Sequence, residues 1–118
     1  MYVALINNLP DDFSFVDYES IWSYSASPIH KKDIQVDILA IADNNDYSLI
    51  GEAKNRKAKF SVKEAKIFLA KALEVKQLES VSKAVFFVFS AGGFFQNTIQ
   101  FLKESNIAWS ADKKFLAL

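Results

Sequence analysis

Three residues, Asp37, Glu52 and Lys54, have types and spacing that suit metal-assisted phosphoryl chemistry. Two carboxylates held close together repel each other, and burial raises the free-energy cost of keeping both ionised. A divalent cation removes that repulsion, because Mg²⁺ and Mn²⁺ prefer hard oxygen ligands from carboxylates and waters. Such an ion polarises a phosphoryl oxygen and lowers the pKa of a bound water. Lys54 would hold that water or neutralise charge that develops in the transition state.

A predicted β-hairpin would bring these residues together. Two β-branched, apolar runs, at residues 33–42 and 47–54, flank an Asp-Asn-Asn-Asp turn signal at residues 43–46. If the turn is centred between its two asparagines, Asp37 lies directly opposite Glu52, with Cβ atoms roughly 4.5–5.5 Å apart. Lys54 shares the face of Glu52, since side chains alternate along a strand.

The alternative is that Asp37 and Glu52 face solvent at a sheet edge, with Lys54 as an ion-pair partner worth about 0–1 kcal/mol. The Glu-x-Lys pattern alone carries little information, because Glu64-Ala-Lys66 and Glu74-Val-Lys76 repeat it. Those copies fall in a predicted helix, where residues i and i+2 point to different sides. Only the first copy follows an apolar strand that carries an acid in the matching register, which favours the functional interpretation.

The remaining pattern predicts an α/β domain with a mixed sheet and helices packed on it. Strands are expected at residues 13–24, 33–42, 47–54 and 83–90, with short terminal strands at 107–109 and 115–118. Helices are expected at 62–79, behind the capping box Ser61-Val62-Lys63-Glu64, and at 94–104. Residues 25–32 are expected to form a loop. The pair Gly92-Gly93 would form either a strand-to-helix turn, which we favour, or an anion-binding nest.

Composition excludes several classes of protein. The chain has 118 residues, of which 51% are hydrophobic, and it fits one domain over residues 1–118, with an ambiguous segment at 1–12. No run approaches 18 apolar residues and the first residues lack a basic region, so we expect no membrane span, no secretory signal and a cytoplasmic location. The absence of cysteine excludes thiol chemistry and Cys-based metal sites, and the single histidine, His30, excludes a multi-histidine site.

Positive charge follows the candidate site along the chain. Residues 1–50 carry a net charge of −6 and residues 51–118 carry +6. Six basic residues are concentrated after the second strand: Lys54, Arg56, Lys57, Lys59, Lys63 and Lys66. Such a group suits the phosphate backbone of a nucleic acid, although a solvated helix start has the same composition.

The segment Val36-Asp37-Ile38-Leu39-Ala40, followed by a short turn and Leu49-Ile50-Gly51-Glu52-Ala53-Lys54, resembles the PD-(D/E)XK phosphodiesterase superfamily, which has the restriction-endonuclease-like fold. It is most similar to the C-terminal domain of certain archaeal and bacterial AAA-type ATPases, over roughly residues 15–110. The resemblance implies an αβββαβ core. It also implies Mg²⁺ or Mn²⁺ held by Asp37, Glu52 and the Ala53 carbonyl, with Lys54 as the catalytic lysine.

Two departures from that superfamily stand out. Its first helix, which often supplies another acid, has no convincing counterpart in this chain. Glu19 is the nearest candidate for that acid, and it lies on a predicted strand. No Walker-type Gly-x-x-x-x-Gly-Lys-Ser/Thr motif is present in the chain, so an ATPase would have to be a separate module.

The expected function is therefore metal-dependent hydrolysis of nucleic acid, with DNA favoured over RNA. Arg56, Lys57, Lys59 and Lys63 are the expected phosphate contacts. A second copy of the chain and an AAA-type ATPase module are further candidate partners. The alternatives are a non-catalytic nucleic-acid-binding or protein-interaction module on the same fold, and a toxin or defence effector with the same chemistry.

Overall fold

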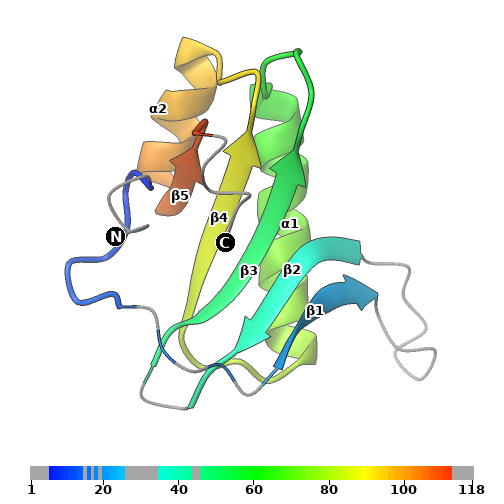
Figure 1. Cartoon of the computed structure of the whole chain (residues 1–118), viewed down its shortest axis with the longest axis vertical. Coiled ribbons are helices and arrows are strands. Elements are labelled where there is room, and N and C mark those ends of the chain that lie inside the picture. The colour runs from blue at the N-terminus through cyan, green and yellow to red at the C-terminus, as the bar shows by residue number, and fades with distance from the viewer. Residues whose placement is uncertain are drawn as a thin grey trace.

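The structure is a computed structural model, which describes residues 6–14, 16, 18, 20–25, 35–43 and 46–112, with backbone only for residues 20–25. The elements in chain order are β1 (Ser20–Ser25), β2 (Gln35–Ile41), β3 (Ser48–Lys54), α1 (Val62–Leu78), β4 (Ala84–Ser90), α2 (Gln96–Glu104) and β5 (Ile107–Ser110). The strands form one sheet in the order β1-β2-β3-β4-β5 (Figure 1). β1, β2 and β3 pair antiparallel, whereas β3, β4 and β5 pair parallel. The predicted α/β class with a mixed sheet is confirmed.

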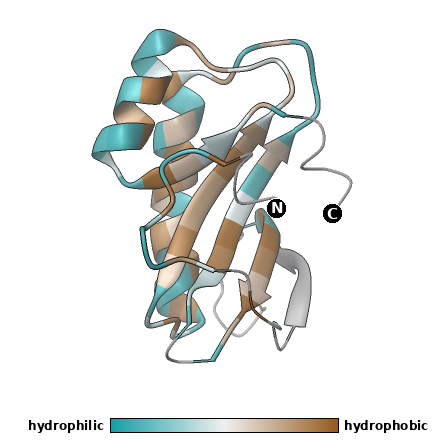
Figure 2. Ribbon diagram, turned by 60° about the vertical axis from the view of Figure 1, so that its left-hand side comes forward, coloured by the Kyte–Doolittle hydropathy of each residue, from teal (hydrophilic) through white to brown (hydrophobic). Residues whose placement is uncertain are grey.

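Both helices lie on one face of the sheet, and the main core lies between them and the strands (Figure 2). The apolar stripe of α1 is fully buried at Ala65, Phe68, Ala72 and Val75. It packs with Leu39, Ile50 and Val88 from the sheet and Leu102 from α2. Figure 2 shows the strands as mainly hydrophobic and the outer sides of the helices as largely hydrophilic. Burial of this apolar surface is the main force that holds the helices on the sheet.

The opposite face of the sheet is covered by an irregular segment that precedes β1. Phe13 packs with Val85, Phe87 and Phe89 in a second core cluster, to which Leu9 also contributes. The predicted strand over residues 13–24 is therefore wrong in its first half, because β1 begins only at Ser20. Phe13 packs its side chain onto the sheet instead of pairing its backbone in a strand.

The other predicted elements agree with the structure to within one or two residues. α1 begins with the expected capping box at Ser61 and Glu64, and α2 begins at Gln96 rather than residue 94. In the predicted hairpin turn the Asp46 N–H donates to the Asp43 carbonyl at 2.9 Å. Most of the predicted loop at 25–32, the centre of the hairpin turn and the predicted strand at 115–118 lie outside the described residues.

The helices of the described part of the chain are limited to one side of the sheet and to positions after β3. Residues 6–14, 16 and 18 contain no helix, so the first helix of an αβββαβ core is not found among them. None of the described helices has the length and apolar composition needed to cross a membrane.

Candidate functional site

The β2–β3 pairing has the predicted register, but its last pair away from the turn is Ile38 with Gly51, so Asp37 is not paired. Ile38 pairs with Gly51, and the next two pairs toward the turn continue in the same register. One further step would place Asp37 opposite Glu52, but the two backbones separate there, and Figure 1 shows β2 bending away from β3. Beyond Gly51, β3 therefore has no backbone ladder with β2.

A β-bulge in β2 lies at the point of separation. Val36 and Leu39 of β2 belong to consecutive pairs with β1. Two residues, Asp37 and Ile38, lie between them in β2, whereas only one residue lies between their partners in β1. This extra residue explains why Val36 and Leu39, which are three positions apart, both pack in the core on the α1 side. Bulges re-aim side chains and are enriched beside active sites. Simple alternation, on which the sequence prediction depended, does not apply at Asp37.

The Asp37 carboxylate is attached to β3 by a hydrogen bond. The Ala53 N–H donates to Asp37 Oδ2 at 2.8 Å. Backbone groups alternate in direction along a strand, and the Lys54 carbonyl accepts from Ala91 on the β4 side. The N–H and carbonyl of Ala53 therefore point toward β2. The Asp37 carboxylate takes the place of the β2 backbone carbonyl that would accept from Ala53 in a regular antiparallel pair. It is thereby bonded to the residue between Glu52 and Lys54.

Glu52 lies on the face of the sheet that α1 covers, and its partner is a lysine from that helix. Its exposed fraction is 7%, and Lys71 Nζ donates to Glu52 Oε1 at 2.7 Å. The sequence analysis missed Lys71, although the helical pattern contained a signal. Lys71 is three residues after Phe68 and four before Val75, so it falls within the buried stripe of α1. A lysine in that stripe requires a partner.

Lys54 lies beside a buried hydroxyl. Its register partner in β4 is Ser90, which is 0% exposed. The Ser90 Oγ has no hydrogen-bond partner within the described part of the chain. Buried polar atoms are nearly always hydrogen-bonded, to protein or to water. The end of β3 therefore offers an unused hydroxyl next to Lys54.

Removal of the Lys71 charge is expected to destabilise the fold. Replacing Lys71 by Met leaves Glu52 buried and unpaired, and we expect a loss of about 2 kcal/mol, less than for a fully buried pair because Lys71 is half-exposed. Urea unfolding at pH 7 measures this loss. The double variant Lys71→Met with Glu52→Gln should recover most of it, and the exposed Lys63→Met should stay within about 0.5 kcal/mol of the parent. Equal unfolding midpoints for Lys71→Met and the parent would contradict the ion pair.

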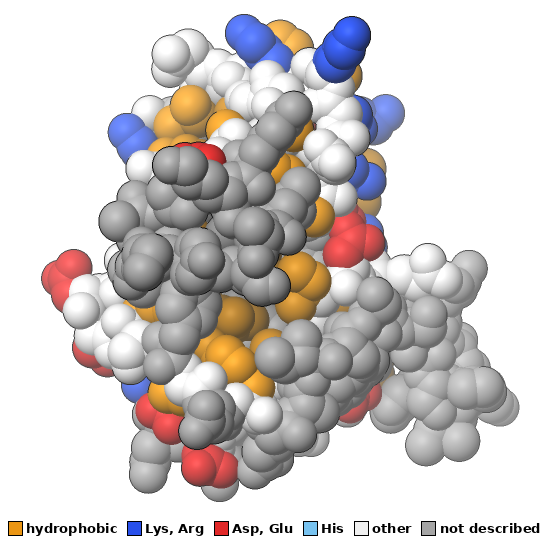
Figure 3. All heavy atoms as spheres, viewed as in Figure 1, with side chains coloured by type: hydrophobic (Ala, Val, Ile, Leu, Met, Phe, Trp, Pro, Cys, Tyr) orange, Lys and Arg blue, Asp and Glu red, His pale blue; other side chains and the backbone are white. Residues whose placement is uncertain are grey.

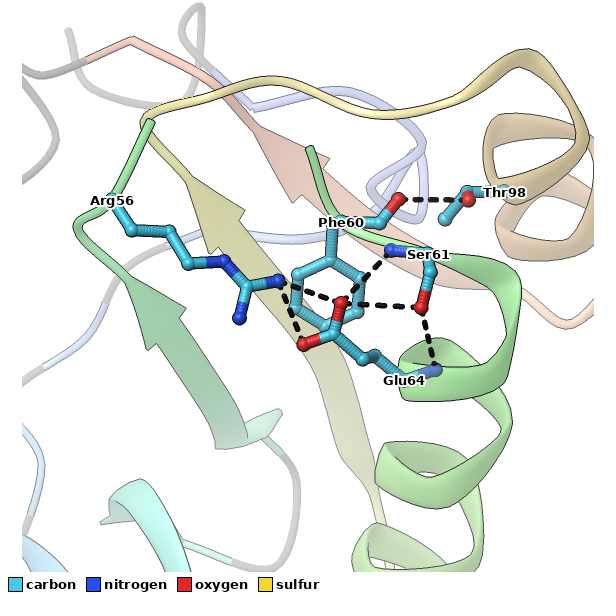
Figure 4. Close-up of polar contacts among 5 residues, drawn as sticks. All are labelled: Arg56, Phe60, Ser61, Glu64 and Thr98. Atoms are coloured by element: carbon cyan, nitrogen blue, oxygen red, sulfur yellow. Dashed lines mark hydrogen bonds and ion pairs between the residues drawn. The ribbon is translucent and has the colours of Figure 1, made fainter. Parts of the chain in front are cut away.

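Arg56, one of the four predicted phosphate contacts, is engaged within the protein (Figure 4). Its Nη2 donates to both carboxylate oxygens of Glu64, at 2.6 and 2.7 Å. Glu64 Oε1 also accepts from the Ser61 N–H at 3.1 Å, while the Glu64 N–H donates to Ser61 Oγ at 3.2 Å. The guanidinium therefore connects the β3–α1 loop to the first turn of α1. The other three predicted contacts, Lys57, Lys59 and Lys63, are exposed.

This network makes the stability of the fold depend on acid pH. Desolvation raises the pKa of Glu64, but hydrogen bonds from Arg56 and Ser61 outweigh it and hold the pKa below its usual 4.5. A carboxylate with a lowered pKa in the folded state stabilises the fold above its unfolded-state pKa, and the stabilisation is lost as pH falls through the folded-state value.

The Glu64→Gln variant is therefore expected to be less stable than the parent by about 1 kcal/mol at pH 7. The difference should close as the pH falls through the lowered folded-state pKa of Glu64, where the carboxylate becomes protonated in the parent. Urea unfolding at pH 7 and at pH 3 measures the two differences. Glu104→Gln, the same substitution at an exposed position on α2, serves as the control for the change of side chain. A constant difference between parent and Glu64→Gln at both pH values would contradict the network.

The two loops at the carboxyl ends of β3 and β4 are held tightly together. The Phe60 N–H donates to the Gly93 carbonyl at 2.9 Å, and Thr98 Oγ1 donates to the Phe60 carbonyl at 2.8 Å (Figure 4). A Cβ on Gly92 would lie 2.4 Å from the carbonyl oxygens of Lys57 and Ala58, so only glycine allows this approach. Gly93 adopts φ +84°. The glycine pair thus forms the strand-to-helix turn that was favoured.

Positive charge gathers at this end of the molecule. In Figure 3, Lys and Arg side chains cluster at the upper end, beyond the tips of β3 and β4, and most of the visible carboxylates lie lower. On this face of the described residues, positive charge therefore lies at the carboxyl ends of β3 and β4.

Glu19, the candidate for a further acid, lies outside the described residues, as does the single histidine, His30. Within the described ranges no three His, Asp or Glu side chains group as metal ligands. The site consists instead of two carboxylates, one carbonyl and two lysines. A scan against protein-family models finds no match to the chain, and searches of curated proteins and of solved structures find none either.

Proposed function

We propose that the domain hydrolyses phosphodiester bonds of nucleic acid with the help of Mg²⁺ or Mn²⁺, on a restriction-endonuclease-like arrangement of β2, β3 and β4. One observation carries the proposal. The Asp37 carboxylate is bonded to the Ala53 N–H, and Ala53 lies between Glu52 and Lys54 in β3. The backbone thus links the acid of one strand to the Glu-x-Lys segment of the next, and a bulge distorts β2 at that point.

The residues present suit a hard divalent cation. Asp37 and Glu52 would supply carboxylate oxygens, and the Ala53 carbonyl points toward β2, the strand that carries Asp37. Mg²⁺ commonly uses one or two carboxylates and keeps several waters, so a third acid is not required. Bound there, the ion would polarise the scissile phosphate and lower the pKa of a water. Lys71 bonds to Glu52 Oε1, which leaves Oε2 as the oxygen for a ligand.

The remaining residues would bind and orient the substrate. Lys54 would hold the attacking water or balance charge on the phosphate, and Ser90 would offer its unused hydroxyl to the same water. Lys57, Lys59 and Lys63 would attract the phosphate backbone without reading its sequence.

One observation favours a second candidate, a non-catalytic nucleic-acid-binding module. The Glu52–Lys71 ion pair already neutralises the more buried of the two acids. A site whose charge is balanced by lysine has less need of a cation, so binding without hydrolysis is the competing function. The basic end of the molecule would serve both.

The test is incubation of the purified protein with labelled DNA and RNA, single- and double-stranded, with Mg²⁺, with Mn²⁺ and with EDTA. The proposal expects cleavage only with a divalent ion. A parallel titration with Mn²⁺, followed by NMR line broadening, should broaden the amide signals of residues 37 and 52–54 first. Binding of nucleic acid without cleavage under any metal condition, and without selective broadening, would leave the non-catalytic module as the function.

A further inference from the structure

Two consecutive phenylalanines after the Gly92-Gly93 turn have opposite environments. Phe94 packs against the main core, with its ring centroid 5.7 Å from that of Phe60. Phe95 is 47% exposed, and it is the one aromatic among the large hydrophobic side chains that are exposed in the described residues. Its ring therefore contributes little to the core.

The local structure does not explain the ring either. Phe95 occupies the N-cap position of α2, where its side chain makes no capping hydrogen bond. Ser, Thr, Asp or Asn at an N-cap would satisfy a free backbone N–H, and their absence costs roughly 1 kcal/mol. In α1 the same position is filled by Ser61 with a full capping box. The fold thus carries an exposed aromatic where a capping residue would be more stable.

The surroundings of Phe95 are positively charged. Lys59 Nζ lies 5.6 Å from the centroid of the Phe95 ring, within range of a cation–π interaction. Lys57 and Lys63 are exposed on the same loop and on the first turn of α1. Glu64, the acid nearest to Lys59 and Lys63 along the chain, is already bonded to Arg56. An exposed aromatic beside lysines that form no ion pair within the described residues is complementary to bases and phosphates together.

The ring and the candidate site lie at the same end of the sheet and are rigidly connected. The Phe95 N–H donates to the Phe60 carbonyl at 3.4 Å, and Phe60 follows Lys59 in the loop that begins at Lys54. The Lys54 carbonyl in turn accepts from Ala91, at the start of the loop that leads to Phe95.

We infer that Phe95 is a stacking platform for an unpaired base, with Lys59 and Lys57 binding the adjoining phosphates. The substrate class is therefore single-stranded nucleic acid or an unpaired end, because both faces of a base inside a duplex are already covered by its neighbours. This inference rests on the proposed nucleic-acid substrate. It does not require cleavage, because stacking and phosphate contacts need no metal ion.

The experiment measures binding in EDTA, by fluorescence anisotropy, of a labelled single-stranded 12-mer and of the same sequence as a blunt duplex. The variants are Phe95→Ser, Phe95→Trp and Lys59→Ala, with the exposed Leu73→Ser on α1 as the matched control. Phe95→Ser is chosen because serine can cap α2, so the fold should be retained or stabilised while the ring is removed.

We expect the parent to bind the single strand more tightly than the duplex. Phe95→Ser should weaken single-strand binding roughly 5- to 100-fold and leave duplex binding within about twofold, whereas Phe95→Trp should keep the parent affinity. Lys59→Ala should weaken binding of both forms. It should also reduce by about one the steepness of the plot of the logarithm of the binding constant against the logarithm of the salt concentration. Leu73→Ser should change neither affinity.

Unchanged single-strand affinity in Phe95→Ser, or equal affinity of the parent for the two forms, would overturn the inference. Because the measurement excludes metal, these results are independent of cleavage. A parent that binds single strands through Phe95 but never cleaves them would retain the inference and lose the proposed hydrolysis. If the parent cleaves nucleic acid and Phe95→Ser leaves single-strand affinity unchanged, the proposed hydrolysis is retained and the stacking inference is lost.

Discussion

Glu52→Gln and Lys54→Met are each expected to reduce Mg²⁺-dependent cleavage of nucleic acid by at least about 100-fold while the chain remains folded. Glu52→Gln replaces a carboxylate oxygen ligand by a neutral amide, which binds hard cations weakly. Lys54→Met removes the charge that would hold the water or balance the phosphate, and keeps the length of the side chain. Asp37→Asn should behave like Glu52→Gln. Initial rates at saturating Mg²⁺, together with circular dichroism of each variant, give the measurement.

The chain contains its own matched controls for this prediction. Glu74→Gln and Lys76→Met change the same Glu-x-Lys pattern where it occurs in α1, and they should retain cleavage within about threefold. Cleavage that survives both Glu52→Gln and Lys54→Met would show that the activity belongs to another site. A loss that appears equally in the α1 controls would indicate a general effect of charge on binding rather than chemistry at the end of β3.

The hairpin and its register were predictable because local signals agree there. Apolar alternation on both strands, together with a turn rich in Asp and Asn, fixes which residues oppose each other, and Ile38 pairs with Gly51 as expected. The bulge at Asp37 was not predictable from that pattern. It is produced by pairing of β2 with β1 on its other side, and the sequence of β2 alone does not reveal how two neighbours differ in register.

The partners of the charged residues were harder to predict than the elements that carry them. Lys71 comes 19 positions after Glu52 in the chain, and Arg56 and Glu64 are eight apart. Each contact depends on how α1 lies across the sheet, which is set by packing of Phe68 and Val75 rather than by the charges. The sequence therefore predicts which polar residues could form a site, whereas their partners, such as Lys71 for Glu52, are known only from the structure.

Gly51→Ala is expected to lower the free energy of unfolding by about 2–3 kcal/mol, a large effect for one methyl group. A Cβ at Gly51 would lie 2.2 Å from Cζ and 2.3 Å from Cε1 of Phe87, its partner in β4. The ring has little room to move aside, because Phe87 is itself buried with Val85 and Phe89. Urea unfolding at pH 7 measures the loss.

Truncation of the opposing ring should reverse part of this loss and so identify its cause. Phe87→Leu alone is expected to cost about 1–2 kcal/mol through the cavity it creates. The double variant Gly51→Ala with Phe87→Leu should lose less unfolding free energy than the two single variants lose together. The difference should be at least about 1 kcal/mol. Phe89→Leu, a change of equal size in the same cluster, should show simple additivity with Gly51→Ala. Additivity in both pairs would contradict the contact between Gly51 and Phe87.

The same variants connect packing to the candidate site. If Phe87 does not yield, β3 must shift at Gly51, and the next two residues are Glu52 and Ala53, whose side chain and N–H contact Lys71 and Asp37. Gly51→Ala should therefore reduce cleavage more than its stability loss alone would, and Phe87→Leu should restore both together. Restored stability without restored cleavage would mean that the site depends on the ring of Phe87 itself, rather than on the position of the β3 backbone.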